Sequence, residues 1–328
     1  VSYATGTGES LKLLAQSDLM GMTLPRQYGG LNFPAVVFTM AQEIIARSDA
    51  SLQNLFGLQG VAEIIHAFAS EELQDKYLPL FSQGAVTGAM ALTEPEAGSD
   101  LQNVKLKATQ GEDGTWYLQG VKRFITNGNA DILLVLARSD FDEEGGLGLS
   151  LFLCEGKDGV TVRRIEEKLG IHGSPTCELV YDNASARLVG ERQRGLITYV
   201  LALMNGARVG IAAQSLGIAE SAYRVARTYA HTRQQFGRPI EAIPPVAEMV
   251  TDMRIAVEAA RALTYETSRI CDFENNSLRL AETCGDVLSK DEVKRYKKQA
   301  RSLKRLNSML TPMSKYYASE MCCTVADT

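Results

Sequence analysis

The chain has 328 residues, of which 45% are hydrophobic and 22% are charged, and its formal net charge is −5. This length allows one large domain or two to three subdomains with a substantial core, and the composition excludes a disordered chain. The negative net charge argues against nucleic acid as the main partner, because phosphate backbones require a basic surface.

Cysteine spacing and apolar runs indicate the cellular compartment that we expect for the protein. The six cysteines form neither a CxxC motif nor a plausible zinc set, and no secretory signal is visible, so we expect a reduced intracellular protein without a metal site. The most apolar stretch, residues 196–217, is interrupted by Asn205 and Arg208, which favours a buried helix over an integral membrane span. We expect both ends of the chain to be cut.

Residues 1–86 are expected to form an N-terminal helical domain, which is partial here. Their apolar residues recur at spacings of three and four, as in Val61, Ile64, Ile65 and Phe68.

Residues 87–190 change to short runs rich in β-branched and aromatic residues, separated by turn signals such as Asp113-Gly114. No long helix separates these runs. The pattern therefore predicts a central antiparallel β-domain, sheet-like or barrel-like, and excludes a βαβ array.

Helical periodicity returns over residues 191–328 and predicts a C-terminal helical bundle, also partial. We expect one helix over 207–233, capped by Gly237, and a second over 245–272. The architecture is therefore multidomain α and β, with helices, a small β-domain and helices in that order.

Residues 272–307 are expected to be an extended helical insertion. The run 289–292, Ser-Lys-Asp-Glu, has the pattern of a capping box and would open a third helix, which Thr311-Pro312 would end before a fourth begins. The insertion carries a basic cluster, Lys290, Lys294, Arg295, Lys297, Lys298, Arg301, Lys304 and Arg305. A solvated helix face is the favoured interpretation, and a docking site for a redox partner, another domain or an acidic surface is the alternative.

Residues 91–100, ALTEPEAGSD, are the first candidate for a binding segment. Pro95 disfavours helix, Gly98 allows a close approach by another molecule, and Thr93 and Ser99 add hydroxyls beside free backbone amides. Such a segment can lie edge-on against a flat polar heterocycle. The residues alone slightly favour the alternative, a plain loop between helix and strand.

Residues 122–131, KRFITNGNAD, form a second candidate. Phe124, Ile125 and Thr126 could form a wall against a ring system, with the threonine as a donor, although a strand ending in a turn is the favoured interpretation for the run alone. In the loop over 166–182, a catalytic role for His172 is disfavoured, because a lone loop histidine is more often neither ligand nor base.

Arg208 and Arg233 stand near the two ends of the helix expected over 207–233. A charge in the first turn of an apolar helix needs a partner or an anion. Arg233 suits the negative end of the helix dipole, so a purely structural role is the alternative.

Four segments, ALTEPEAGSD, RFITNG, KLGIHGSPTCELVYDN and residues 207–240, resemble in their order and spacing the acyl-CoA dehydrogenase family of flavoenzymes. The resemblance covers nearly the whole chain, and the insertion is similar to that of larger bacterial-type members. It implies FAD as cofactor, α,β-dehydrogenation of an acyl-CoA thioester in fatty acid metabolism, and an electron-transferring flavoprotein as acceptor. The implied location is the cytoplasm of a bacterium or the mitochondrial matrix of a eukaryote.

The resemblance implies that the first two motifs line FAD with backbone, hydroxyl and aromatic groups. The residues in this role are Met90, Leu92, Thr93, Gly98, Ser99, Phe124, Ile125 and Thr126. Arg233, Gln235 and Phe236 match a motif that contacts the FAD of a neighbouring subunit, which implies a homodimer or homotetramer.

For the substrate, Ser99 and Ser174 match positions along the path of the CoA pantetheine arm. Asn205 and Arg208 match the segment that meets the CoA nucleotide, where an anionic ligand would compensate the guanidinium of Arg208.

The implied reaction needs a carboxylate base for the α-proton, while the β-hydrogen leaves as hydride to the flavin. The family has two positions for this glutamate: Ala207 occupies one, and the other is expected beyond Thr328, so no catalytic base is assigned. Two alternatives stay open. One is an acyl-CoA oxidase or a related flavin oxidase or monooxygenase on the same fold, and the other is a non-catalytic flavin- or acyl-CoA-binding protein that lacks the base.

Overall fold

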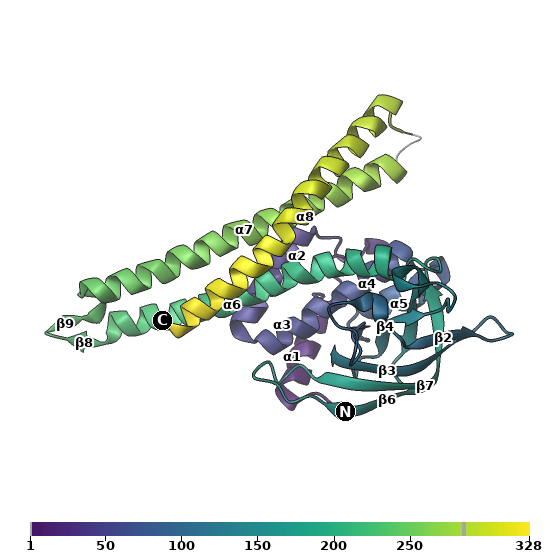
Figure 1. Cartoon of the computed structure of the whole chain (residues 1–328). Helices are drawn as coiled ribbons and strands as arrows, with labels where there is room; N and C mark the ends of the chain where they lie inside the picture. The colour runs from purple at the N-terminus through teal and green to yellow at the C-terminus, as the bar shows by residue number, and fades with distance from the viewer. Residues whose placement is uncertain (1, 284–286) are drawn as a thin grey trace. The chain divides into compact units, whose positions relative to one another are not determined.

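The computed structural model describes residues 2–283 and 287–328, so Cys284 lies outside the described residues. The chain divides into two compact units (Figure 1). Unit 1 comprises residues 1–33 and 54–207, and unit 2 comprises residues 34–53 and 208–328.

Unit 1 begins with short helices, as the periodicity predicts. They are α1 (Thr5–Gln16), the C-terminal half of α3 (Ala50–Gly57), α4 (Val61–Phe68) and α5 (Glu71–Ser82).

The β-domain of unit 1 closes into a barrel. Its strands are β1 (Gly88–Ala91), β2 (Lys107–Gln110), β3 (Trp116–Thr126), β4 (Ile132–Arg138), β5 (Leu149–Glu155), β6 (Val160–Ile165) and β7 (Thr176–Val189). Neighbouring strands pair in the closed order β4-β2-β3-β7-β5-β4, while β1 pairs with β4 and β6 pairs with β7. Most pairs are antiparallel, as predicted, but β1 and β2 both run parallel to β4.

Strand β4 is buried on both faces and joins the two cores of unit 1. Leu133 and Val135 belong to the core inside the barrel, with Phe152 and Tyr181. The alternate residues of β4, such as Leu134, pack in the second core beside helices α4 and α5. Because side chains alternate along a strand, a strand between two cores is apolar throughout, as the run ILLVLA is.

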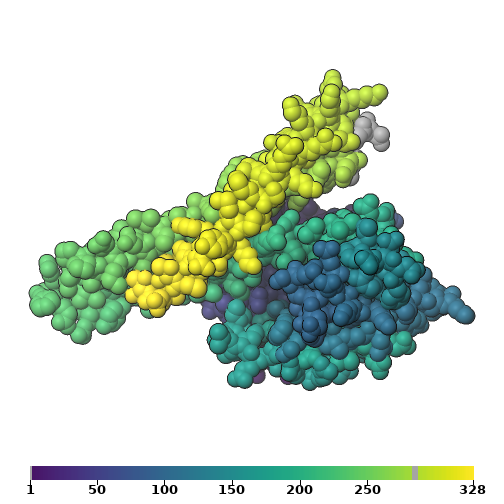
Figure 2. All heavy atoms as spheres, viewed as in Figure 1, coloured from purple at the N-terminus to yellow at the C-terminus, as the bar shows by residue number. Residues whose placement is uncertain are grey.

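Unit 2 is a bundle of long helices. They are α2 (Ala35–Ser48), α6 (Leu201–Thr232, from residue 208), α7 (Pro244–Thr283) and α8 (Lys290–Asp327). Helices α7 and α8 lie side by side along much of their lengths, green and yellow in the ribbon and in the space-filling view (Figure 2). Each of α6, α7 and α8 contributes apolar residues at spacings of three and four to a shared core. Leu216 of α6, Val257 of α7 and Met321 of α8 belong to this core.

The predicted capping box at the start of α8 is confirmed. The amide of Glu292 donates to Ser289 Oγ at 3.3 Å, and the amide of Ser289 donates to Glu292 Oε2 at 2.9 Å. The predicted helix end at Thr311-Pro312 is wrong, because α8 continues through Pro312. Hydroxyl bonds along this turn, from Thr311 to the carbonyl of Asn307 and from Ser314 to that of Thr311, accompany the proline. The expected helix over 245–272 also extends further, to Thr283.

The prediction that Gly237 caps a helix is wrong, because Gly237 lies in the turn of a β-hairpin. Helix α6 ends at Thr232, and β8 (Gln234–Gln235) then pairs with β9 (Arg238–Pro239). Phe236 and Gly237 have φ of 53° and 73°, and two successive positive φ values are typical of the two-residue turn that suits a β-hairpin.

Within the described chain, one helical stretch, Gly195–Thr232, is long and apolar enough to cross a membrane by length and composition, with a mean hydropathy of 1.5. Core helices of soluble proteins meet the same criterion, and Leu203, Val209 and Leu216 are buried in the two units.

Candidate functional site

The segment after β1 is folded back on itself. The amide of Glu94 donates to the carbonyl of Ala97 at 2.9 Å, and the amide of Ala97 donates to the backbone carbonyl of Glu94 at 3.2 Å. Gly98 and Ser99 follow this turn and are exposed, while Thr93 before it is half-buried. The hydroxyl-bearing residues of the motif therefore flank a tight turn.

Lys122 holds this turn against strand β3. Its side chain is 0% exposed, and its Nζ donates to the carbonyl of Leu92 at 2.8 Å and to Glu94 Oε1 at 2.9 Å. Glu94 also accepts from the amides of Lys105 and Leu106, at 2.8 and 2.9 Å. Burial lowers the pKa of Lys122 to about 8, and the adjacent Glu94 opposes that effect. A lysine on a predicted strand is usually exposed, so the sequence analysis missed both Lys122 and Glu94.

The aromatic motif lies directly beyond Lys122 on the same strand. The amide of Arg123 donates to the carbonyl of Thr93 at 2.9 Å, so the two predicted segments are in contact. The pairing of β3 with β7 slips between Lys122 and Ile125, which marks a β-bulge. At this bulge Phe124 has φ of 59° and is 52% exposed, whereas Ile125 is buried.

A second loop meets the end of β3. Thr126 pairs with Thr176 of β7, and Ser174 just before that strand is buried. The Ser174 hydroxyl has no hydrogen-bond partner among the described residues. Lys168 Nζ secures the loop by donating to the carbonyl of Ser174 at 2.5 Å and to Thr176 Oγ1 at 3.0 Å. Burial lowers the pKa of Lys168.

The remaining predicted residues of unit 1 have simpler positions. Met90 is half-buried on β1, and Leu92 is buried, so Leu92 offers mainly its backbone. Asn205 is exposed near the start of α6. His172 is exposed, and its Nε2 lies 2.6 Å from the carbonyl of Lys168 on the same loop.

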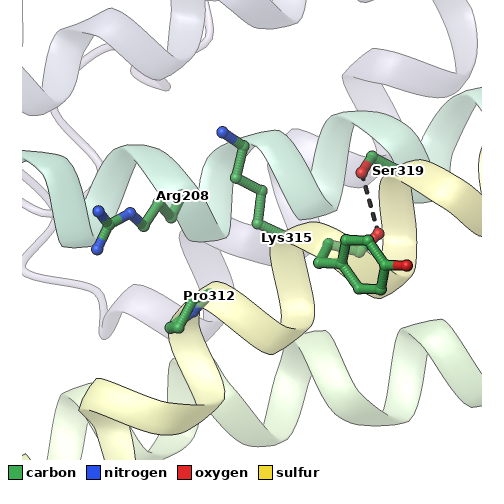
Figure 3. Close-up of a pocket in the computed structure, with 5 residues that line it drawn as sticks. Arg208, Pro312, Lys315 and Ser319 are labelled. Carbon is green, nitrogen blue, oxygen red and sulfur yellow. Dashed lines mark hydrogen bonds between the residues drawn. The ribbon is translucent and has the colours of Figure 1, made fainter. Parts of the chain in front are cut away.

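Arg208 in unit 2 lines a cavity of about 500 Å³ between helices α6 and α8 (Figure 3). Pro312, Lys315, Tyr316 and Ser319 of α8 form its other wall. Two cationic side chains therefore come from facing helices, and the cavity is suited to an anion. The sequence analysis identified Arg208 but not Lys315.

Arg233, Gln235 and Phe236 lie at the β8–β9 hairpin. The carbonyl of Arg233 accepts from the amide of Ile240 at 2.9 Å, and Phe236 at the tip is 89% exposed. A large exposed aromatic residue beside polar groups is typical of a surface that contacts another molecule.

The two segments of unit 1 together offer backbone amides, hydroxyls and one exposed aromatic face. This set can hold a planar polar heterocycle by edge contacts and stacking.

Three family models match the chain in order. The N-terminal domain of acyl-CoA dehydrogenase matches residues 4–85, the middle domain residues 89–184, and the C-terminal domain residues 194–328. The chain is 38% identical to an acyl-CoA dehydrogenase of Bacillus subtilis (strain 168) over 286 residues, which cover 85% of this chain and 73% of the relative.

Solved structures agree with these matches. Butyryl-CoA dehydrogenase from Megasphaera elsdenii has a TM-score of 0.77 and 29% identity, with 94% of this chain and 89% of that chain covered. An acyl-CoA dehydrogenase complexed with FAD from Bacillus anthracis has the same TM-score and identity. There the match covers 97% of this chain and 54% of the other.

Proposed function

Since this chain belongs to the acyl-CoA dehydrogenase family, we propose that it catalyses α,β-dehydrogenation of an acyl-CoA thioester and passes the electrons to an electron-transferring flavoprotein. The family consists of FAD-dependent oxidoreductases, and FAD is the cofactor. The observation that carries the proposal is the contact between the two motif segments, fixed by buried Lys122 and by the bond from Arg123 to Thr93.

Two features of unit 1 fit bound ligands: one fits the flavin and the other fits the substrate. Phe124 has a positive φ, which strains the backbone of a bulky residue, and its ring is exposed. Backbone strain of this kind is concentrated at binding and active sites. Ser174 has a buried hydroxyl without a partner, and a bound ligand would satisfy it. We assign Phe124 to stacking on the isoalloxazine, and Thr93, Ser99 and Thr126 to edge contacts.

The flavin, when bound, supplies the acceptor for the hydride. The chain's own groups position the substrate: Ser99 and Ser174 along the pantetheine arm, and Asn205 and Arg208 at the CoA nucleotide. Lys315 shares the cavity with Arg208 and adds a second cation for phosphate oxygens. Ala207 has no acidic group, so we propose that the α-proton is taken by a glutamate at the family's other position.

Assembly and location belong to the same proposal. We assign Arg233, Gln235 and Phe236 to the FAD of a neighbouring subunit, within a homodimer or homotetramer. The exposed hairpin ring supports this assignment. The protein would work in the bacterial cytoplasm or the mitochondrial matrix.

The test is anaerobic bleaching of the bound flavin in the full-length protein across a series of acyl-CoA esters. We expect bleaching with at least one ester, and its chain length would identify the substrate class. Reoxidation by an electron-transferring flavoprotein without peroxide release in air would separate a dehydrogenase from an oxidase. Bound flavin that no ester bleaches would overturn the proposal in favour of a non-catalytic binding protein.

A further inference from the structure

A second cavity, of about 520 Å³, lies within unit 2 between α2, α6 and α7. Its lining consists of five arginines, three glutamates and Tyr223. The cavity therefore offers little apolar surface for an acyl chain. It shares no lining residue with the cavity around Arg208.

Close backbone packing brings the charged side chains together. A Cβ on Gly217 of α6 would lie 2.5 Å from the carbonyl oxygen of Glu43 and 2.7 Å from the amide of Arg47, so only glycine allows α2 to approach α6 this closely. About one and two turns from this contact, α6 presents Glu220 and Arg224 to the same cavity.

The carboxylates of the cavity are already neutralised. Buried Glu43 accepts from Arg261 Nη2 at 2.8 Å, and the same nitrogen reaches Glu220 at 2.8 Å. Arg261 Nη1 lies 3.0 Å from Glu258, and Arg224 Nε donates to Glu220 at 2.5 Å. Burial acts to raise the pKa of Glu220, but its bonds to Arg224 and Arg261 outweigh burial and lower it.

Three guanidinium groups are left over. Arg47, Arg227 and Arg254 line the cavity and have no ion pair within residues 2–283 and 287–328. Five arginines against three glutamates leave an excess of two positive charges. Guanidinium groups bind phosphate and carboxylate oxygens in pairs of parallel hydrogen bonds, so an anion would relieve the mutual repulsion of these groups.

We propose that this cavity is a binding site for a small hydrophilic polyanion that carries at least two phosphate or carboxylate groups. Arg47, Arg227 and Arg254 bind the ligand, and the network around Arg261 forms a fixed floor that keeps Glu43 and Glu220 from competing. The proposal does not rest on the proposed reaction.

The test is calorimetric titration of the flavin-loaded full-length protein with inorganic pyrophosphate at low ionic strength. With the cavity around Arg208 occupied by saturating CoA, we expect one equivalent of pyrophosphate per chain. Arg227→Gln and Arg254→Gln should each weaken binding roughly tenfold or more, because each removes a hydrogen-bonded charge from the anion. Arg301→Gln, an exposed arginine on α8, is the matched control and should change the affinity less than about twofold.

Three results would overturn the proposal. The first is the absence of pyrophosphate binding. The second is binding that Lys315→Gln weakens but Arg227→Gln and Arg254→Gln do not, which would assign the anion to the cavity around Arg208. The third is dissociation of an oligomer by the arginine variants with pyrophosphate affinity unchanged, measured by sedimentation velocity, which would show that the surface meets acidic groups of a second copy.

Discussion

Two ion clusters, one in each unit, differ in the kind of partner that their charged groups bind. In the β-barrel, Lys122 meets a single carboxylate, that of Glu94, and the remaining partners of both are backbone groups. In the helical unit, Arg261 meets three carboxylates from three helices, and each partner is a side chain. A cluster bonded to backbone fixes the path of the chain, whereas a cluster of side chains joins elements whose paths are already set.

This difference explains which cluster lies near the proposed flavin site. The backbone bonds of Lys122 and Glu94 determine where the segment after β1 meets the bulge of β3, so they set the relative positions of Thr93 and Phe124. The network of Arg261 instead draws α2, α6 and α7 together, and it leaves neighbouring charges available for another ligand.

The largest expected effect comes from Lys122→Met, which leaves the Glu94 carboxylate buried without its cation. We expect a loss of about 3–5 kcal/mol in the free energy of unfolding, measured by urea denaturation, together with loss of bound FAD. Adding Glu94→Gln should recover part of the stability, since it removes the buried charge and its amide oxygen can still accept from one of the two backbone amides. A loss below about 1 kcal/mol would show that the pair does not hold the segment.

Arg261→Met should have a smaller effect, about 2–3 kcal/mol on the same measurement. Water reaches the Arg261 side chain, which is 21% exposed, and Tyr265 also donates to Glu43, so the carboxylates keep partial compensation. Arg261→Lys should lose roughly half as much, because it keeps the charge but not the planar fork. FAD content should stay constant in both variants. If flavin is lost, the division of roles between the clusters is wrong.

Phe124→Gly separates stability from binding beside the Lys122 cluster. Glycine adopts a positive φ without strain, and the half-exposed ring contributes little packing, so we expect about 1 kcal/mol of added stability. The affinity for FAD should fall roughly three- to tenfold through lost stacking, measured by flavin titration of the apoprotein. Phe141→Gly, at another exposed phenylalanine, should produce neither change.

The smallest effect extends the comparison to a pair at the surface. Hydrogen bonds from Tyr77 and Lys76 lower the pKa of Glu155. A lowered pKa in the folded state gives stability that is present above the ordinary glutamate pKa and is lost as pH falls through the lowered value. Glu155→Gln should therefore cost less than about 1 kcal/mol near pH 7, and the difference should shrink below about pH 4. Urea denaturation at a series of pH values would contradict this if the difference grew in acid.

Patterns of neighbouring residues in the sequence predicted those structural features that depend on interactions between neighbouring residues. The capping box of Ser289 and Glu292 formed as expected, because its bonds span three residues. Short runs rich in β-branched and aromatic residues, separated by turn signals, predicted a sheet-like or barrel-like β-domain, and the four motifs predicted the family. The parallel pairing of β1 with β4 and the partner of Lys122 depend on residues about 30 to 45 positions apart, which no local pattern contains. Pro312 shows the converse: its local preference to end a helix was overridden by packing along α8.

Pro312 has a further consequence for α8. A proline has no amide hydrogen, so the carbonyl of Ser308 lacks the usual bond from four residues later. The helix can therefore bend at this point without breaking another backbone bond, and this point lies in the wall that faces Arg208. We expect amide hydrogen exchange to divide α8 into two cooperative segments that meet at Pro312. An anion that binds beside Arg208 and Lys315 should slow exchange more in the segment after Pro312, which contains Lys315, than in the segment before it.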